Sequence, residues 1–120
     1  MAQDRFTGVG LGLRRPHLEQ VARLEGHGVP FWETCPENVV GDGGRHHRLA
    51  CAILDRDPVL THGLALSVGG FDAWDPDYLH DLGDFLVRTG TPWHSEHLCF
   101  TRVDGSCLHE LLPLPFTREA

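Results

Sequence analysis

The sequence lacks three features, and each absence excludes a class of protein. It contains no run of about eighteen consecutive apolar residues, so we do not expect it to span a membrane. Its cysteines show no C-x-x-C spacing, which argues against a zinc knuckle or a redox pair. Basic side chains are in deficit, since the net charge is −7 at pH 7 with histidine neutral. Proteins that bind nucleic-acid phosphates concentrate Lys and Arg, so we do not expect a nucleic-acid partner.

Residues 1–12 also lack the basic region and the apolar run of a secretory signal. A protein without such a signal and without paired cysteines is expected in the cytoplasm, where thiols stay reduced. We therefore predict a cytoplasmic protein with reduced and mostly buried thiols. The four cysteines are Cys35, Cys51, Cys99 and Cys107.

Histidine, in contrast, is abundant, with nine in a chain of 120 residues. The imidazole titrates near neutral pH and is a common metal ligand, so this number suggests metal or proton chemistry. Not every histidine is a candidate. His46, His47 and His80 lie among charged residues, and we expect them to be solvated.

Short apolar segments alternate along the chain with segments of helical periodicity. Asp75 followed by Pro76 marks the start of one helix, because Asp is a preferred N-cap and Pro suits the first helical position. We expect residues 1–7 to be a short flexible lead and residues 103–106 to form a hairpin-like turn. The predicted strands are 8–13, 29–34, 58–68 and 91–100, and the predicted helices are 16–25, 45–54 and 76–89.

This alternation predicts an α/β fold with a parallel sheet and right-handed crossovers, either an open doubly wound sheet or part of a (β/α) barrel. The positions of the polar residues favour the barrel. Glu37 and Asn38 follow the second strand, His62 lies at the exit of the third, and Glu96 and His97 lie near the exit of the fourth. Barrel active sites are assembled at the C-terminal ends of neighbouring strands.

The segment 91–100 carries the densest set of these residues. Strand residues alternate between faces, so His94 and Glu96 should point one way, and Ser95 and His97 the other. Charged groups are rarely buried without a partner or a metal. Carboxylate and imidazole with a nearby amide oxygen suit iron, manganese or zinc. The alternative without a metal is Glu96 as general base with His62 or His97 as acid.

Five segments together resemble, in order and spacing, the domain of unknown function 692 family, also called UPF0276 and described as multinuclear non-haem iron-dependent oxidative enzymes. The segments are Gly10-Leu11-Gly12-Leu13-Arg14 with Pro16-His17, Trp32-Glu33 with Glu37-Asn38, His62-Gly63 with Leu66-Ser67 and Gly69, Ser95-Glu96-His97-Leu98, and Leu111-Leu112-Pro113-Leu114-Pro115-Phe116-Thr117.

The resemblance implies a TIM-type barrel of the xylose isomerase-like kind, with two or three irons of mixed valence at its C-terminal mouth. It implies oxidation of cysteine residues in a ribosomally synthesised precursor peptide by dioxygen, often with a partner protein that recognises the peptide leader. By position, the family's metal ligands would be Glu37, Asn38, His62, Glu96 and His97, with Glu96 and His62 also catalytic.

The sequence departs from the family pattern at Cys35, where many members have histidine, and at His94, where members have an aliphatic residue. A (β/α)₈ barrel needs roughly 250 residues. We therefore predict that residues 8–120 form the N-terminal half of the barrel, derived from an iron-dependent oxidoreductase and not active alone. The alternatives are a non-catalytic or truncated half-barrel that needs a second chain, and a divalent-metal isomerase or hydrolase on the same barrel.

Overall fold

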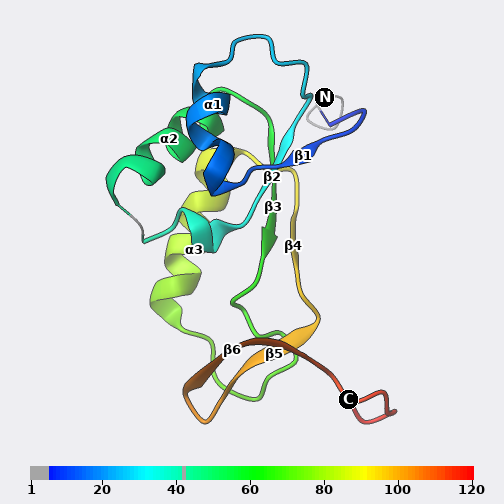
Figure 1. The fold of residues 1–120 in the computed structure, drawn as a ribbon. Coiled ribbons are helices and arrows are strands. Elements are labelled where there is room, and N and C mark those ends of the chain that lie inside the picture. Colours follow the sequence, from blue (N-terminus) through cyan, green and yellow to red (C-terminus); the bar gives the residue numbers. More distant parts are fainter. Residues whose placement is uncertain (1–5, 42) are drawn as a thin grey trace.

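The computed structural model describes residues 6–41 and 43–120, so most of the predicted lead at 1–7 lies outside the described residues. Four parallel strands form one sheet in the order β1-β2-β3-β4 (Figure 1). This confirms the predicted α/β class and the strand–helix alternation. The strands are β1 (Leu11–Gly12), β2 (Trp32–Thr34), β3 (Val59–Gly63) and β4 (His94–Glu96).

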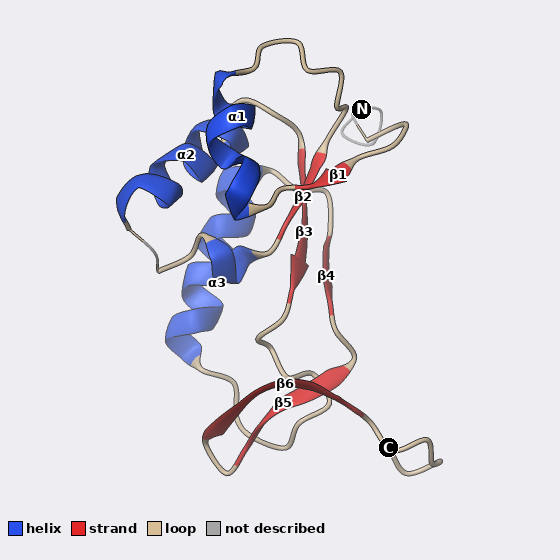
Figure 2. Cartoon of the chain, in the orientation of Figure 1, coloured by secondary structure: helices blue, strands red, loops and turns tan. Residues whose placement is uncertain are grey.

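Three α-helices connect these strands, and within the described residues they lie on one side of the sheet (Figure 2). They are α1 (Leu18–Arg23), α2 (Gly44–Leu54) and α3 (Pro76–Thr89), with short 3-10 turns at Arg15–His17 and Pro36–Asn38. A parallel sheet with a helix in each crossover is compatible with part of a TIM-type barrel.

The core lies between this face of the sheet and the helices. Ile53 of α2 and Val59 of β3 have no exposed surface, and Trp32 of β2 and Phe85 of α3 pack in the same cluster. Burying an aliphatic or aromatic side chain of this size contributes about 1.5–3 kcal/mol. The core therefore fixes which face of β3 turns toward the helices.

Helix α3 begins and ends where the sequence predicts. The Asp75 side chain accepts hydrogen bonds from the N–H groups of Asp77 (3.0 Å) and Tyr78 (3.4 Å), and Pro76 opens the helix. Gly90 closes it in the left-handed region at φ 59°. This N-cap matters for the site, because it fixes the first turn of α3, from which the Tyr78 hydroxyl reaches Glu37 after β2.

The predicted strand 91–100 is wrong as a single element. Strand β4 ends at Glu96, and Cys99 begins β5 (Cys99–Val103), which pairs antiparallel with β6 (Ser106–Pro113) in a separate two-stranded sheet. The hairpin turn at 103–106 is confirmed, with positive φ at both Asp104 (50°) and Gly105 (75°). The long apolar segment is therefore divided between two sheets.

Two further expectations are also wrong. All four cysteines are free, but only Cys99 is buried, while Cys35 and Cys51 are partly exposed and Cys107 is exposed. His47 is only partly solvated, because its imidazole is half-buried and hydrogen-bonded to the Val39 carbonyl.

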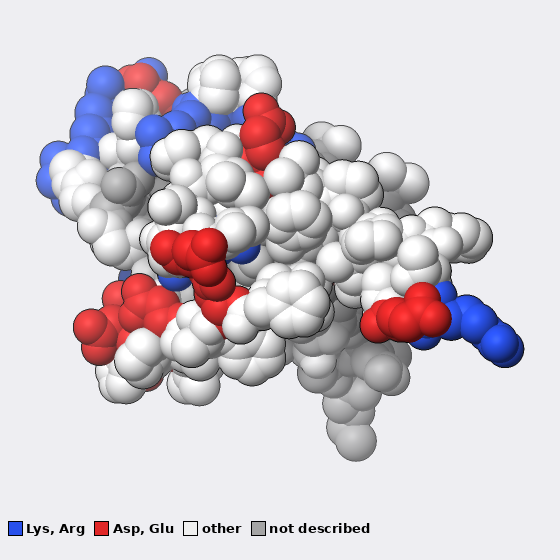
Figure 3. Space-filling view, turned by 90° about the horizontal axis from the view of Figure 1, so that it is seen from below, with Lys and Arg blue, Asp and Glu red and all other residues white. Residues whose placement is uncertain are grey.

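The charge distribution agrees with the acidic composition. On the face seen from below, acidic side chains stand in several separate groups among mostly uncharged residues (Figure 3). None of the described helices is long and apolar enough to cross a bilayer.

Candidate functional site

The residues at the strand ends form two groups on opposite faces of β3 and β4. The register pairs His62 with Ser95 and Gly63 with Glu96, so the two pairs point to opposite sides. Glu96 lies on the side of the helices with Glu37, and His62 lies on the other side. The alternation predicted for 94–97 is confirmed, but the predicted ligands are divided between the faces.

Glu37 is held by four donors. Its Oε1 accepts from the N–H groups of Leu64 and Ala65 (both 2.9 Å) and from the Tyr78 hydroxyl (2.6 Å), and its Oε2 accepts from the Cys35 thiol (2.8 Å). Hydrogen bonds to a carboxylate are stronger than those between neutral groups. The side chain is thus fixed at the junction of β2, β3 and α3.

The protonation states in this group follow from burial and from these bonds. Burial raises the pKa of Glu37, but the hydrogen bonds from Cys35 and Tyr78 outweigh it, so the net pKa is lowered. Burial, followed by the contact with Glu37, raises the pKa of Cys35 to about 12 and also raises the pKa of Tyr78. Glu37 is therefore an anion between two groups that keep their protons.

Glu96 lies close by in a different state. Its Oε1 accepts from the Leu66 N–H (2.7 Å), while its Oε2 is buried and has no hydrogen-bond partner. Burial and then the negative charge of Glu37 raise the pKa of Glu96. A buried carboxylate oxygen without a partner is costly, and such atoms commonly mark the place of an ion or a water.

His94 provides a second buried atom without a partner, its Nε2. The Thr61 hydroxyl lies 3.5 Å from the Trp93 carbonyl, to which it donates, and 3.0 Å from His94 Nδ1. In the tautomer with the proton on Nδ1, the ring donates to the hydroxyl and Nε2 of His94 holds a free electron pair, which is the form that could bind a cation.

Gly63 lies beneath both unpartnered side chains. A Cβ at this position would come within 2.4 Å of Glu96 Oε2 and 3.0 Å of His94 Cε1. Both side chains therefore cover the same backbone position, and only glycine leaves room for them.

The second group consists of His62, Ser95 and His97. The Ser95 hydroxyl lies 2.7 Å from His62 Nδ1 and 3.4 Å from the Thr61 carbonyl, and His97 Nδ1 donates to the Gly63 carbonyl (2.9 Å). The two imidazole rings lie 4.4 Å apart between centroids. The Gly63 carbonyl can only accept, so His97 donates through Nδ1 and presents Nε2 as an electron-pair donor, which is the arrangement of metal-binding histidines.

Among the described residues, no three side chains of His, Cys, Asp or Glu lie together as a group that could hold a metal ion. Asn38 is exposed in its 3-10 turn. The predicted ligand set Glu37, Asn38, His62, Glu96 and His97 therefore stays a prediction. The donors that are present suit a metal of the iron, manganese or zinc kind.

Sequence reasoning missed two participants. Tyr78 reaches Glu37 because the N-terminus of α3 lies near the end of β2, and Thr61 orients His94 across the register of β3 and β4. The N-cap at Asp75 was the one signal near Tyr78, and it indicated a helix start, not a contact.

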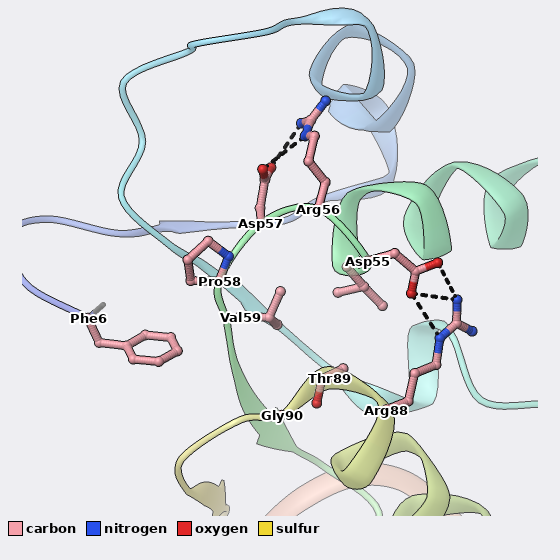
Figure 4. A pocket seen from close by; sticks show the side chains of 10 residues that line it. Phe6, Asp55, Arg56, Asp57, Pro58, Val59, Arg88, Thr89 and Gly90 are labelled. Atoms are coloured by element: carbon pink, nitrogen blue, oxygen red, sulfur yellow. Dashed lines mark hydrogen bonds and ion pairs between the residues drawn. The ribbon is translucent and has the colours of Figure 1, made fainter. Parts of the chain in front are cut away.

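A cavity of about 270 Å³ lies at the other end of β3, where the chain enters the strand. Asp55, Arg56, Asp57 and Arg88 form ion pairs at its wall (Figure 4). These charges are already paired with one another, so this cavity is not the candidate site.

The parallel sheet, the one-sided helices and the polar groups at the strand ends define an α/β protein with carboxylate and imidazole side chains gathered at the C-terminal ends of its strands. The family profile described as RiPP precursor modification enzyme MbnB/TglH/ChrH matches residues 8–120. The chain belongs to this family, as the resemblance to domain of unknown function 692 predicts.

Curated relatives agree with this assignment. A UPF0276 protein of Caulobacter vibrioides is 42% identical over 120 residues, which cover 100% of this chain and 43% of the relative. UPF0276 proteins of Acinetobacter baylyi and Pseudomonas aeruginosa are 42% and 39% identical, over 96% and 100% of this chain and 39% and 42% of their own lengths. The chain thus spans about two fifths of the length of these relatives.

Proposed function

We propose that this chain forms the N-terminal portion of a (β/α)₈-barrel enzyme that oxidises cysteine residues of a ribosomally synthesised precursor peptide with iron and dioxygen. The family supports the peptide-modifying part of this proposal, since its profile covers residues 8–120 and is named for precursor modification. The rest of the barrel would come from further chain or from a second polypeptide. A partner that presents the peptide leader, and a cytoplasmic location, belong to the same proposal.

The observation that carries the metal part is the pair of buried, unpartnered atoms, His94 Nε2 and Glu96 Oε2. Both cover Gly63, and both can donate an electron pair, His94 in the tautomer that carries its proton on Nδ1. A cation satisfies two such donors at once. His62 and His97 offer two more imidazole nitrogens beyond the opposite face of the strands.

Iron bound by such residues would supply the redox chemistry that dioxygen needs, with open coordination positions for substrate. The residues of this chain hold the donors in place. Leu66 N–H fixes one oxygen of Glu96 and leaves the other free, and Thr61 fixes the ring of His94. Glu37 stays anionic and adds negative charge beside Glu96, which favours a cation there.

Anaerobic reconstitution with ferrous iron, followed by metal analysis, tests this proposal. We expect Glu96→Ala to retain several-fold less iron than wild type, and His94→Ala to show a similar loss. His80→Ala is the matched control, since His80 is 74% exposed on α3. The metal part of the proposal would be refuted if the wild-type protein held no iron above background and Glu96→Ala gave the same result.

The chemistry is tested separately with dioxygen and a cysteine-containing precursor peptide, by measuring oxygen uptake and the mass of the peptide. Because the chain spans about two fifths of its relatives, this assay requires the chain together with whatever completes the barrel. Reactivation by manganese or zinc without oxygen uptake would instead favour an isomerase or a hydrolase.

A further inference from the structure

Cys51 lies in a cluster of side chains on the outer helices, away from the strand ends. It is on α2, one turn after His47, and its Sγ is 3.4 Å from His47 Nε2. Arg88 of α3 donates from Nη1 to the same sulfur at 3.1 Å. The sulfur therefore touches an imidazole and a guanidinium at the contact between two helices.

The imidazole is held in the form that can accept the thiol proton. His47 Nδ1 lies 3.1 Å from the carbonyl oxygen of Val39, and a carbonyl only accepts hydrogen bonds. Nδ1 therefore carries the hydrogen, and Nε2 presents its electron pair to Cys51. A thiol, an imidazole acceptor and a third group that orients the imidazole make the arrangement of an activated nucleophile.

The guanidinium is also held in place. Asp55 at the end of α2 accepts from Arg88 Nε (3.1 Å) and twice from Nη2 (both 2.9 Å), as Figure 4 shows. This contact leaves Nη1 to donate to Cys51. Cysteines beside a cation and a histidine, with partial exposure, are the reactive ones in proteins.

The other cysteines provide an internal comparison. Burial raises the pKa of Cys99 and, with Glu37, that of Cys35, so neither is expected to react readily. Cys107 is exposed and lies opposite Arg102 in the β5–β6 ladder; His109 Nδ1 is 3.8 Å from its sulfur, and among the described residues no arginine is found hydrogen-bonded to that sulfur. If exposure alone controlled reactivity, Cys107 would react before the partly buried Cys51.

We propose that Cys51 is a site of oxidation by hydrogen peroxide, activated by His47 and Arg88. In this step the sulfur attacks one peroxide oxygen, an S–O bond forms and the O–O bond breaks. Sulfur is oxidised to sulfenic acid and peroxide is reduced to water, with His47 taking the thiol proton and returning it to the leaving hydroxide. The side chains of this site come from α2, its C-cap and α3, with the Val39 carbonyl behind His47, so the site does not depend on the proposed peptide chemistry.

The first experiment measures the alkylation rate of each cysteine of the full chain with limiting iodoacetamide, by peptide mass spectrometry. We expect Cys51 to react about ten-fold faster than Cys107. His47→Gln and Arg88→Met should each lower the rate at Cys51 several-fold and leave Cys107 unchanged. Arg45→Met is the matched control, because it removes a cation from the same helix that contacts Glu19 and not Cys51.

The second experiment treats the chain with hydrogen peroxide and traps sulfenic acid with dimedone. The label should appear on Cys51, and Asp55→Asn should reduce it, since this exposed substitution releases Arg88 without touching the core. Circular dichroism confirms that each variant is folded. Faster alkylation of Cys107, an unchanged Cys51 rate in the folded His47→Gln and Arg88→Met variants, or dimedone on Cys107 and not on Cys51 would overturn the proposal.

Discussion

Asp57 provides the sharpest test of how the start of β3 is stabilised. Its Oδ2 accepts from the indole of Trp32 (3.0 Å), from His27 Nε2 (3.1 Å) and from Arg56 Nη2 (2.9 Å), and its Oδ1 accepts from Arg56 Nε (2.9 Å). Only 12% of the side chain is exposed. The carboxylate thus connects the segment between α2 and β3 with β2 and with the loop that precedes β2.

The expected stabilisation follows from the pKa of Asp57. Hydrogen bonds from Arg56 lower this pKa most, burial opposes them, and the bonds from Trp32 and His27 lower it further, so it falls from 3.8 to about 2. A difference of this size corresponds to about 2.5 kcal/mol. Because Arg56 is 35% exposed, solvent screens part of the interaction, and we expect about 1–2 kcal/mol.

Because the pKa of Asp57 is lowered, the direction in which its contribution to stability changes with pH is fixed. A carboxyl group with a lowered pKa in the folded state stabilises the protein above the unfolded pKa, near 4, and loses that contribution as the pH falls toward 2. Asp57→Asn keeps the shape and an acceptor for Trp32 but removes the charge. Its free energy of unfolding should be about 1–2 kcal/mol below that of wild type at pH 7, with about half of that gap left at pH 3.

Urea unfolding, followed by tryptophan fluorescence at pH 7, 5 and 3, measures this gap. Asp55→Asn is the matched control, because Asp55 is 58% exposed and its pair with Arg88 should contribute within about 0.5 kcal/mol. A gap between wild type and Asp57→Asn that is the same at pH 7 and pH 3 would refute the reasoning, as would no gap at pH 7.

Three further substitutions have definite expected outcomes. Gly63→Ala brings a methyl group to 2.4 Å from Glu96 Oε2, so it should displace the carboxylate and weaken iron binding several-fold in an anaerobic titration. Gly83→Ala, exposed in α3 with nothing within 4 Å of the added methyl, should raise the free energy of unfolding by about 1 kcal/mol in urea. Asp75→Ala removes the N-cap of α3 and should lower the free energy of unfolding by about 1 kcal/mol, also measured by urea unfolding.

The sequence was sufficient where the signal is local. The N-cap at Asp75, the glycine that ends α3 and the Asp104-Gly105 turn each depend on a few neighbouring residues, and the structure confirms them. The alternation of strands and helices rests on periodicity and was predicted for the same reason.

The sequence was insufficient where contacts are distant. Segment 91–100 reads as one apolar strand, and nothing local indicates that its second half pairs with residues 106–113. His47 lies among charged residues in the sequence, yet the fold brings the Val39 carbonyl to its ring. Tyr78 meets Glu37 across 41 positions of sequence, a contact that periodicity does not report.

The division of the donors between two faces has a physical cause in β3. Val59 and Thr61 are buried toward the helices, with 0% and 1% exposed surface, and the alternation of a strand then places Gly63 on the same side and His62 on the other. Moving His62 to the side of Glu96 would need a shift of one residue, which would remove Val59 from the core. The core that stabilises the sheet therefore also separates the His62 and His97 pair from Glu96 and His94. If one metal cluster uses both groups, its ligands must reach around the ends of β3 and β4, where Gly63 and the N–H groups of Leu64, Ala65 and Leu66 lie.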